Sequence, residues 1–108
     1  MWAENGENLD RALDLIARAV SLDPENGAYI DSLGWAHFQL GQFHEAKSYL
    51  ERASRLVPAD AVILEHLGDL YRTLGDEFEA RRVYELAVQL EAENLDQVRD
   101  KLVELDGR

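Results

Sequence analysis

The chain has 108 residues, of which 46% are hydrophobic, a size and apolar fraction that fit one folded domain and argue against wholesale disorder. Its 22 acidic and 11 basic residues give a formal net charge of −11, which excludes nucleic acid as an expected partner and suits a basic or apolar one. The chain has no cysteine, which excludes disulfides and thiolate metal sites, and no apolar run approaches the roughly 18 residues of a membrane span.

Apolar residues spaced by three and four along the chain predict helices rather than strands. In chain order the predicted helices span 8–22, 27–40, 43–56, 61–74, 77–91 and 95–106. Pro24 and Pro58 each follow a predicted helix, because proline cannot donate an amide hydrogen bond and clashes with the preceding turn. Asn26, Asp60 and Asn94 precede the next helices, and each has a side-chain oxygen that can accept a first-turn amide.

The connections between the paired helices are short. Gly41 and Gly75 lie in turns that leave room only for antiparallel neighbours. Asp76 and Glu79 also have the spacing of a capping box at the start of the helix 77–91. The predicted fold class is therefore all-α, built from antiparallel helix hairpins.

Residues 34 positions apart match repeatedly along the chain. Ala12, Ala46 and Ala80 form one such series, and Leu33 and Leu67 form another. A fixed period of about 34 residues is typical of stacked helical hairpins, each of which buries its apolar face only against its neighbours. The period divides the chain into half a repeat (8–24), two full repeats (27–60 and 61–94) and a capping helix (95–106).

This pattern resembles the tetratricopeptide repeat, whose unit carries small and large residues at set positions. The matching residues are Ile30, Leu33, Gly34, Ala46, Leu50, Ala53 and Pro58 in the first unit, and Leu64, Leu67, Gly68, Tyr71, Ala80, Tyr84 and Ala87 in the second. Glycine inside a helix costs about 1 kcal/mol relative to alanine, so Gly34 and Gly68 predict a close approach of the paired helix. The resemblance implies a right-handed α-solenoid, and the segment DSLGWA at 31–36 suggests the C-terminal part of a bacterial multi-repeat protein.

Both ends of the chain depart from the complete unit. The helix 8–22 matches only the second helix of a unit, and the first is interpreted as missing or reduced to a stub at 1–5. At the other end Leu102 stands at the glycine position, so the helix 95–106 is interpreted as a cap. The predicted exposed apolar residues of the first helix are Leu9, Leu13, Ile16 and Val20. The predicted inward residues of the cap are Leu95, Val98, Leu102 and Leu105, with Asp96, Arg99, Asp100 and Glu104 mostly outward.

In proteins of this family the first helices of successive units line a concave groove that takes partner peptides, and the resemblance implies such a groove here. Its residues would be Asp31, Ser32, Trp35, Phe38 and Gln39 in the first unit, and Glu65, His66, Asp69 and Arg72 in the second. Trp35 and Phe38 lie off the core stripe and are of the kind that anchors binding, unless they pack against the neighbouring hairpin. The acidic residues would form a wall, so the expected partner is a protein or peptide with basic or apolar residues.

Two other functions stay open: self-assembly into a homo-oligomer through the apolar side of the helix 8–22, and a purely structural end of a larger array. The clamp by which one subset of the family binds a terminal carboxylate is not expected, because Asp31 would repel that carboxylate. His37, His44 and His66 lack the arrangement of metal ligands, and no serine has a base placed to activate it. We expect no enzymatic activity, no cofactor, no metal and no membrane partner, and a cytoplasmic location unless the chain is a fragment of an exported parent.

Overall fold

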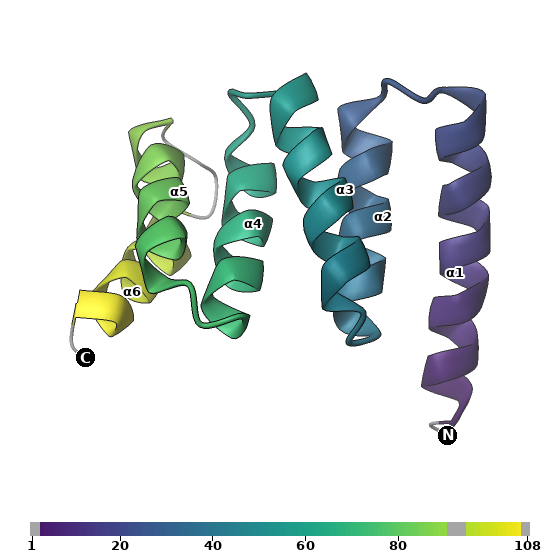
Figure 1. The fold of residues 1–108 in the computed structure, drawn as a ribbon, viewed down its shortest axis with the longest axis horizontal. Coiled ribbons are helices and arrows are strands. Elements are labelled where there is room, and N and C mark those ends of the chain that lie inside the picture. The colour runs from purple at the N-terminus through teal and green to yellow at the C-terminus, as the bar shows by residue number, and fades with distance from the viewer. Residues whose placement is uncertain (1–2, 91–94, 107–108) are drawn as a thin grey trace. The chain divides into compact units, whose positions relative to one another are not determined.

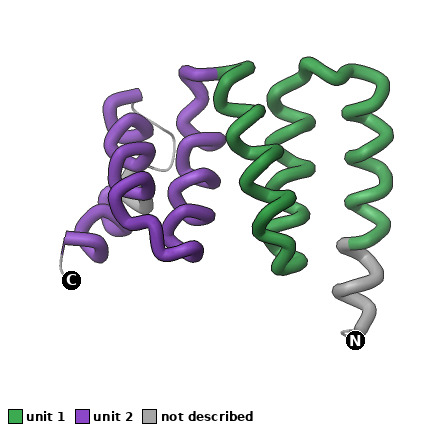
Figure 2. Tube along the Cα trace, viewed as in Figure 1, with its two compact units in different colours: residues 1–57 green, residues 58–108 purple. Residues whose placement is uncertain are grey.

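The computed structural model describes the backbone of residues 3–90 and 95–106, and the side chains of residues 10–90 and 99–106. Over these ranges the chain forms helices and turns without a strand, which confirms the all-α prediction. The helices are α1 (Ala3–Leu22), α2 (Gly27–Gln39), α3 (Phe43–Leu56), α4 (Ala61–Thr73), α5 (Glu77–Gln89) and α6 (Leu95–Asp106), as Figure 1 shows. They form two compact units, 1–57 with α1 to α3 and 58–108 with α4 to α6 (Figure 2).

The predicted helix bounds agree with the structure to within two residues, except at the start of α1. This helix begins at Ala3 rather than near residue 8 and runs for 20 residues. The interpretation of 1–5 as the remnant of a separate helix is therefore wrong for the described residues 3–5, which continue α1. No proline precedes Pro24, and Gly6 inside the helix costs only about 1 kcal/mol relative to alanine, so nothing in the sequence interrupts the run.

Asparagine and aspartate begin the first helix of each hairpin as predicted. The Asn26 side chain accepts a hydrogen bond from the Tyr29 amide, at 3.1 Å, at the start of α2. At the start of α4, Asp60 Oδ1 accepts from two amides, those of Val62 at 2.9 Å and Ile63 at 3.1 Å. These oxygens accept hydrogen bonds from first-turn amides that have no acceptor within the helix.

The capping box at α5 forms only in part. Asp76 Oδ1 accepts from the Glu79 amide at 3.2 Å, but the Glu79 carboxylate binds the Arg82 guanidinium instead of reaching back. The Asp76 amide donates to the Tyr71 carbonyl at 2.8 Å, so it does not need the glutamate. Asn94, the third predicted cap, lies outside the described residues.

Each hairpin is held together by a glycine in its first helix that faces a large side chain of its second. A Cβ atom on Gly34 would lie 2.8 Å from Leu50 Cγ, and one on Gly68 would lie 2.1 Å from Tyr84 Cε1. Neither position has room for a methyl group, so each glycine lets two helices approach closely. Around these contacts the fully buried small residues are Ala46, Ala53, Ala80 and Ala87, and the buried larger ones include Leu33, Leu67 and Tyr71.

The turn glycines have a different role. Gly41 and Gly75 have φ angles of 78° and 85°, in the left-handed region that favours glycine, and a Cβ atom on either would meet nothing within 4 Å. They reverse the chain after α2 and α4. Pro24 and Pro58 then lie in the loops that follow α1 and α3, as the sequence predicted.

The apolar side of α1 differs from the prediction. Leu13, Ile16 and Val20 are half-buried rather than exposed, because they share the side of α1 that packs on α2. The exposed apolar residues are instead Leu15 and Leu22, whose accessible fractions are 65% and 86%. Leu9 lies outside the described side chains. Over the described residues, none of the helices is both long and apolar enough to cross a lipid bilayer.

Candidate functional site

The α2 face of unit 1 presents an aromatic pair. The rings of Trp35 and Phe38 stack with their centroids 4.7 Å apart and their planes 16° from parallel. Phe43, the first residue of α3, meets Phe38 in a tilted arrangement at 5.5 Å. All three side chains are half-buried, whereas Ile30 and Leu33 on the core side of α2 are buried. The structure therefore supports neither extreme of the prediction, because the pair is partly packed and partly accessible.

Polar residues beside the aromatic pair fall into two groups. Ser32 and Gln39 are exposed, so they can exchange hydrogen bonds with water or a partner. Asp31 is only 8% exposed, so its carboxylate does not line an open surface. This corrects the expectation of an acidic wall in unit 1. The α2 face is aromatic with a polar rim.

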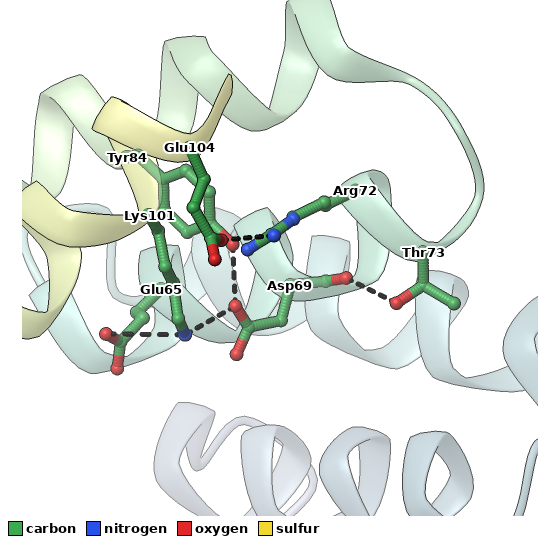
Figure 3. A network of polar contacts seen from close by, with 7 residues as sticks. All are labelled: Glu65, Asp69, Arg72, Thr73, Tyr84, Lys101 and Glu104. Carbon is green, nitrogen blue, oxygen red and sulfur yellow. Dashed lines mark hydrogen bonds and ion pairs between the residues drawn. The ribbon is translucent and has the colours of Figure 1, made fainter. Parts of the chain in front are cut away.

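The equivalent face of α4 in unit 2 carries charge and is engaged by α6. Glu65 is buried and Asp69 is half-buried. The Lys101 ammonium, which comes from α6, lies 2.5 Å from Asp69 Oδ1 and 3.7 Å from Glu65 Oε2 (Figure 3). Next to them Arg72 forms an ion pair with Glu104 of α6. The acidic residues that the sequence placed on an open groove are thus held by a cation of the same chain.

Asp69 is the centre of this polar network. Its Oδ1 also accepts a hydrogen bond from the Tyr84 hydroxyl, at 2.6 Å, and its carbonyl accepts from Thr73 at 2.8 Å (Figure 3). Burial raises the pKa of the Tyr84 phenol above its usual value, and the carboxylate of Asp69 raises it further. The Lys101 ammonium lies 5.8 Å from the centroid of the same ring. Tyr84 therefore fills the space over Gly68 and also orients the acid.

Lys101 is the residue of this network that the sequence analysis missed. It lies 34 positions after Leu67, which itself lies 34 after Leu33, and both leucines are buried. A lysine at the third member of a buried leucine series is a signal for a carboxylate partner inside the fold. On α6 itself Leu105 is buried and Leu102 half-buried, while Arg99, Asp100 and Glu104 are exposed. Leu95, Asp96 and Val98 lie outside the described side chains.

The three histidines lie in different surroundings. The His37 ring stacks on Tyr49 of α3 at 5.3 Å, and its Nδ1 lies 2.6 Å from Gln42 Oε1. His44 is exposed and His66 is half-buried on α4. Among the residues that the structure describes, no group of three or more histidine, aspartate or glutamate side chains is arranged to hold a metal ion.

Sequence comparison relates the chain to known repeat proteins. Two family models described as tetratricopeptide repeat match residues 27–70 and 61–94. A TPR repeat-containing protein of Pseudomonas aeruginosa is 33% identical over 67 residues, which cover 62% of this chain and 11% of that protein. A TPR repeat-containing thioredoxin of Arabidopsis thaliana is 39% identical over 75 residues, or 69% of this chain and 11% of that protein. The chain thus spans only about a tenth of the length of these relatives.

Solved structures agree with the sequence matches. The first tetratricopeptide domain of Spaghetti (RPAP3), solved with a bound HSP90 peptide, superposes with a TM-score of 0.86. The match covers 95% of this chain and 81% of that chain at 23% identity, so it shows the fold alone. With the 34-residue period, the glycine contacts and the family models in agreement, the chain belongs to the tetratricopeptide repeat family.

Proposed function

We propose that the chain is a protein-interaction scaffold that binds a peptide or helix on the α2 face of unit 1. The stacked pair of Trp35 and Phe38, half-accessible on that face, is the observation that carries the proposal. Large aromatic side chains that keep part of their surface in water are typical anchors of binding sites. Exposed Ser32 and Gln39 beside the pair supply a polar rim for main-chain hydrogen bonds.

The chemistry of the partner follows from the face and from the charge of the chain. An apolar side chain of the partner would cover the Trp35 and Phe38 rings. The net charge of −11 would attract lysine and arginine from a distance and raise the association rate. An amphipathic basic helix, or an extended segment with lysine or arginine, meets both conditions.

The Spaghetti domain was solved with an HSP90 peptide, which supports peptide binding as the general role of this fold. The partner itself does not carry over at 23% identity. Asp31 is buried, and the described side chains of this face, Ser32, Trp35, Phe38 and Gln39, include no cation that could pair with a terminal carboxylate. We therefore expect a basic partner rather than an acidic tail.

Three synthetic amphipathic peptides test the proposal. They share one leucine pattern and carry lysine, glutamine or glutamate at the polar positions. Titration calorimetry should rank their affinities lysine, then glutamine, then glutamate. Trp35→Ala combined with Phe38→Ala should abolish binding and leave the helical circular dichroism unchanged. Capture of the lysine peptide by the double variant would refute the assignment of the α2 face.

A matched control tests whether any loss is specific to this face. Tyr29 is an exposed aromatic residue of the same helix, and it lies about 120° around the axis from Trp35. Tyr29→Ala should leave the affinity for the lysine peptide unchanged. An equal loss in Tyr29→Ala would indicate a general effect on α2 rather than a binding face.

Self-assembly is the second candidate function, because α1 exposes Leu15 and Leu22. Exposed leucines on one helix favour burial against another molecule. Light scattering at high micromolar concentration should then show a dimer that Leu15→Glu dissociates. A strict monomer would remove this candidate and leave the binding scaffold or a structural end of a larger array. Enzymatic activity is not expected for any of these roles.

A further inference from the structure

The α6 helix contacts α4 through a lysine at a position where the repeat has a leucine. Leu67 and Leu33, one and two periods earlier, are buried. The Lys101 side chain is 17% exposed, and its ammonium lies between the carboxylates of Asp69 and Glu65 (Figure 3). The α4 face therefore contacts the ammonium group of Lys101 from α6, at a position where the earlier repeats have a buried leucine.

The described side chains of α6 bury little apolar surface. Among its described side chains, Leu105 is buried, and Lys101 and Leu102 are half-buried. Its other described side chains are exposed, namely Arg99, Asp100, Val103, Glu104 and Asp106. In contrast, α5 buries four residues, Ala80, Val83, Tyr84 and Ala87. Over the described residues α6 therefore has the smallest apolar anchor in unit 2.

The described side chains of α6 also form ion pairs with α4 and α5. Arg72 of α4 binds Glu104, and Arg81 of α5 binds Asp106. Glu104 and Asp106 are largely exposed, and pairs of this kind contribute little to stability and weaken with salt. A helix held in this way is expected to detach locally before the core of the unit unfolds.

The face beneath α6 requires a cation. Glu65 and Asp69 lie one helical turn apart on α4, and the Tyr84 hydroxyl holds the Asp69 carboxylate in place. Two carboxylates at this spacing repel each other unless a positive group lies close to both. A detached α6 would leave the face ready to take an ammonium from elsewhere.

We infer that α6 is a displaceable internal occupant of a second partner-binding face, formed on α4 by Glu65 and Asp69. The partner is an amphipathic helix with the spacing that α6 itself shows: a lysine, a glutamate three residues later for Arg72, and a leucine four residues later. Lys101, Glu104 and Leu105 provide this template. The inference rests on the proposed role as an interaction scaffold and assigns it a surface separate from the α2 face.

An added helix must compete with α6 for the α4 face, so the quantity to measure is the affinity of that face for the added helix. The apparent affinity of the α4 face is its intrinsic affinity multiplied by the fraction of molecules in which α6 is open. A change that opens α6 must therefore increase the affinity for an added helix. The probe is a fluorescent synthetic peptide of residues 95–106 with blocked termini, which carries the same lysine, glutamate and leucine.

The decisive variant of the full chain is Lys101→Glu, because a carboxylate there is repelled by Glu65 and Asp69. The probe should bind this variant at least about tenfold more tightly than the wild type. Arg99→Glu is the matched control: it makes the same change of charge on the exposed side of α6 and should leave the affinity as in the wild type. A probe that itself carries Lys101→Glu should not bind either protein.

Equal affinity of the probe for Lys101→Glu, Arg99→Glu and the wild type would overturn the inference. Hydrogen exchange on the wild type gives a second test that needs no variant. The α6 amides should exchange faster than those of α4 and α5, and equal protection would also overturn the inference. Adding Trp35→Ala and Phe38→Ala to the Lys101→Glu chain should not alter probe binding. Failure on the α2 face is thereby distinguishable from failure on α4.

Discussion

The α2 and α4 helices hold equivalent positions in the repeat but expose different chemistry. Three pairs of residues 34 positions apart define the two faces: Asp31 and Glu65, Trp35 and Asp69, and Phe38 and Arg72. In unit 1 the face is aromatic and half-accessible, whereas in unit 2 it is charged and held by α6. The core positions of the two hairpins are nearly the same, so packing fixes the scaffold and leaves the outer face to vary.

The largest expected difference between the two units is at their helix-packing glycines. Gly68→Ala should lower the free energy of unfolding by about 3 kcal/mol, because the new methyl group meets the fully buried Tyr84 ring. Gly34→Ala should cost less, about 1 kcal/mol, because its methyl group would lie 2.8 Å from Leu50 Cγ and 3.1 Å from the Leu50 amide nitrogen, a smaller overlap than with the Tyr84 ring. Urea denaturation measures both values. Equal costs would show that the two hairpins tolerate an added methyl group equally, which would contradict the predicted difference between Gly68 and Gly34.

Tyr84 and Leu50 occupy the same repeat position, but only the tyrosine has a polar contact. Tyr84→Phe removes the hydrogen bond to Asp69 and should cost about 2 kcal/mol of unfolding free energy near neutral pH. Burial and then Asp69 raise the pKa of Tyr84, so the folded state keeps a proton that the unfolded state releases above 10.0. Stability should therefore fall as pH rises above 10.0. This slope should be shallower in Tyr84→Phe than in the wild type, and parallel slopes in the two proteins would contradict the assignment.

Removing the N-terminal caps of α2 and α4 should give a smaller difference in stability between the two units. Asp60→Ala leaves two first-turn amides without their acceptor and should cost about 1 to 2 kcal/mol. Asn26→Ala removes one such contact and should cost about 1 kcal/mol or less. Thermal unfolding of both variants gives the order. A larger cost for Asn26→Ala would indicate that cap geometry, rather than the number of amides, decides stability.

The smallest expected effect is at the exposed ion pair of α5. Arg82 binds Glu79 one turn away, and the Arg82 side chain is exposed while that of Glu79 is half-buried. Arg82→Ala should change the unfolding free energy by no more than about 0.5 kcal/mol, and this small change should vanish in high salt. A double-mutant cycle with Glu79→Ala isolates the pair. A coupling above about 1 kcal/mol would mean that the half-formed capping box of α5 matters more than the geometry indicates.

The helical scaffold could be predicted from the sequence because the repeated residues are those that pack the two helices of each hairpin. The 34-residue period, the glycines at 34 and 68 and the caps at Asn26 and Asp60 all reflect contacts inside one hairpin, where local spacing fixes the neighbours. The start of α1 was placed too late, because no capping residue or proline marks it.

The outer faces were predicted less well, because exposure depends on what covers a residue. The spacing of Glu65 and Asp69 places them on the outer side of α4 but does not reveal that Lys101, more than thirty residues later, lies over them. Trp35 and Phe38 posed the same difficulty, and the structure places them half-accessible. The series of residues 34 positions apart, Leu33, Leu67 and Lys101, carries the signal for this network, because a lysine replaces a buried leucine at its third member.

The accessibility of Trp35 to a partner is the central claim, and its own fluorescence tests it most directly. The chain has two tryptophans, so Trp2→Phe leaves Trp35 as the sole reporter. Titration with the lysine-bearing amphipathic peptide should shift the emission of Trp35 to shorter wavelength in a saturable manner, and the glutamate-bearing peptide should not. An emission spectrum that stays constant while calorimetry records binding of the lysine peptide would contradict the account.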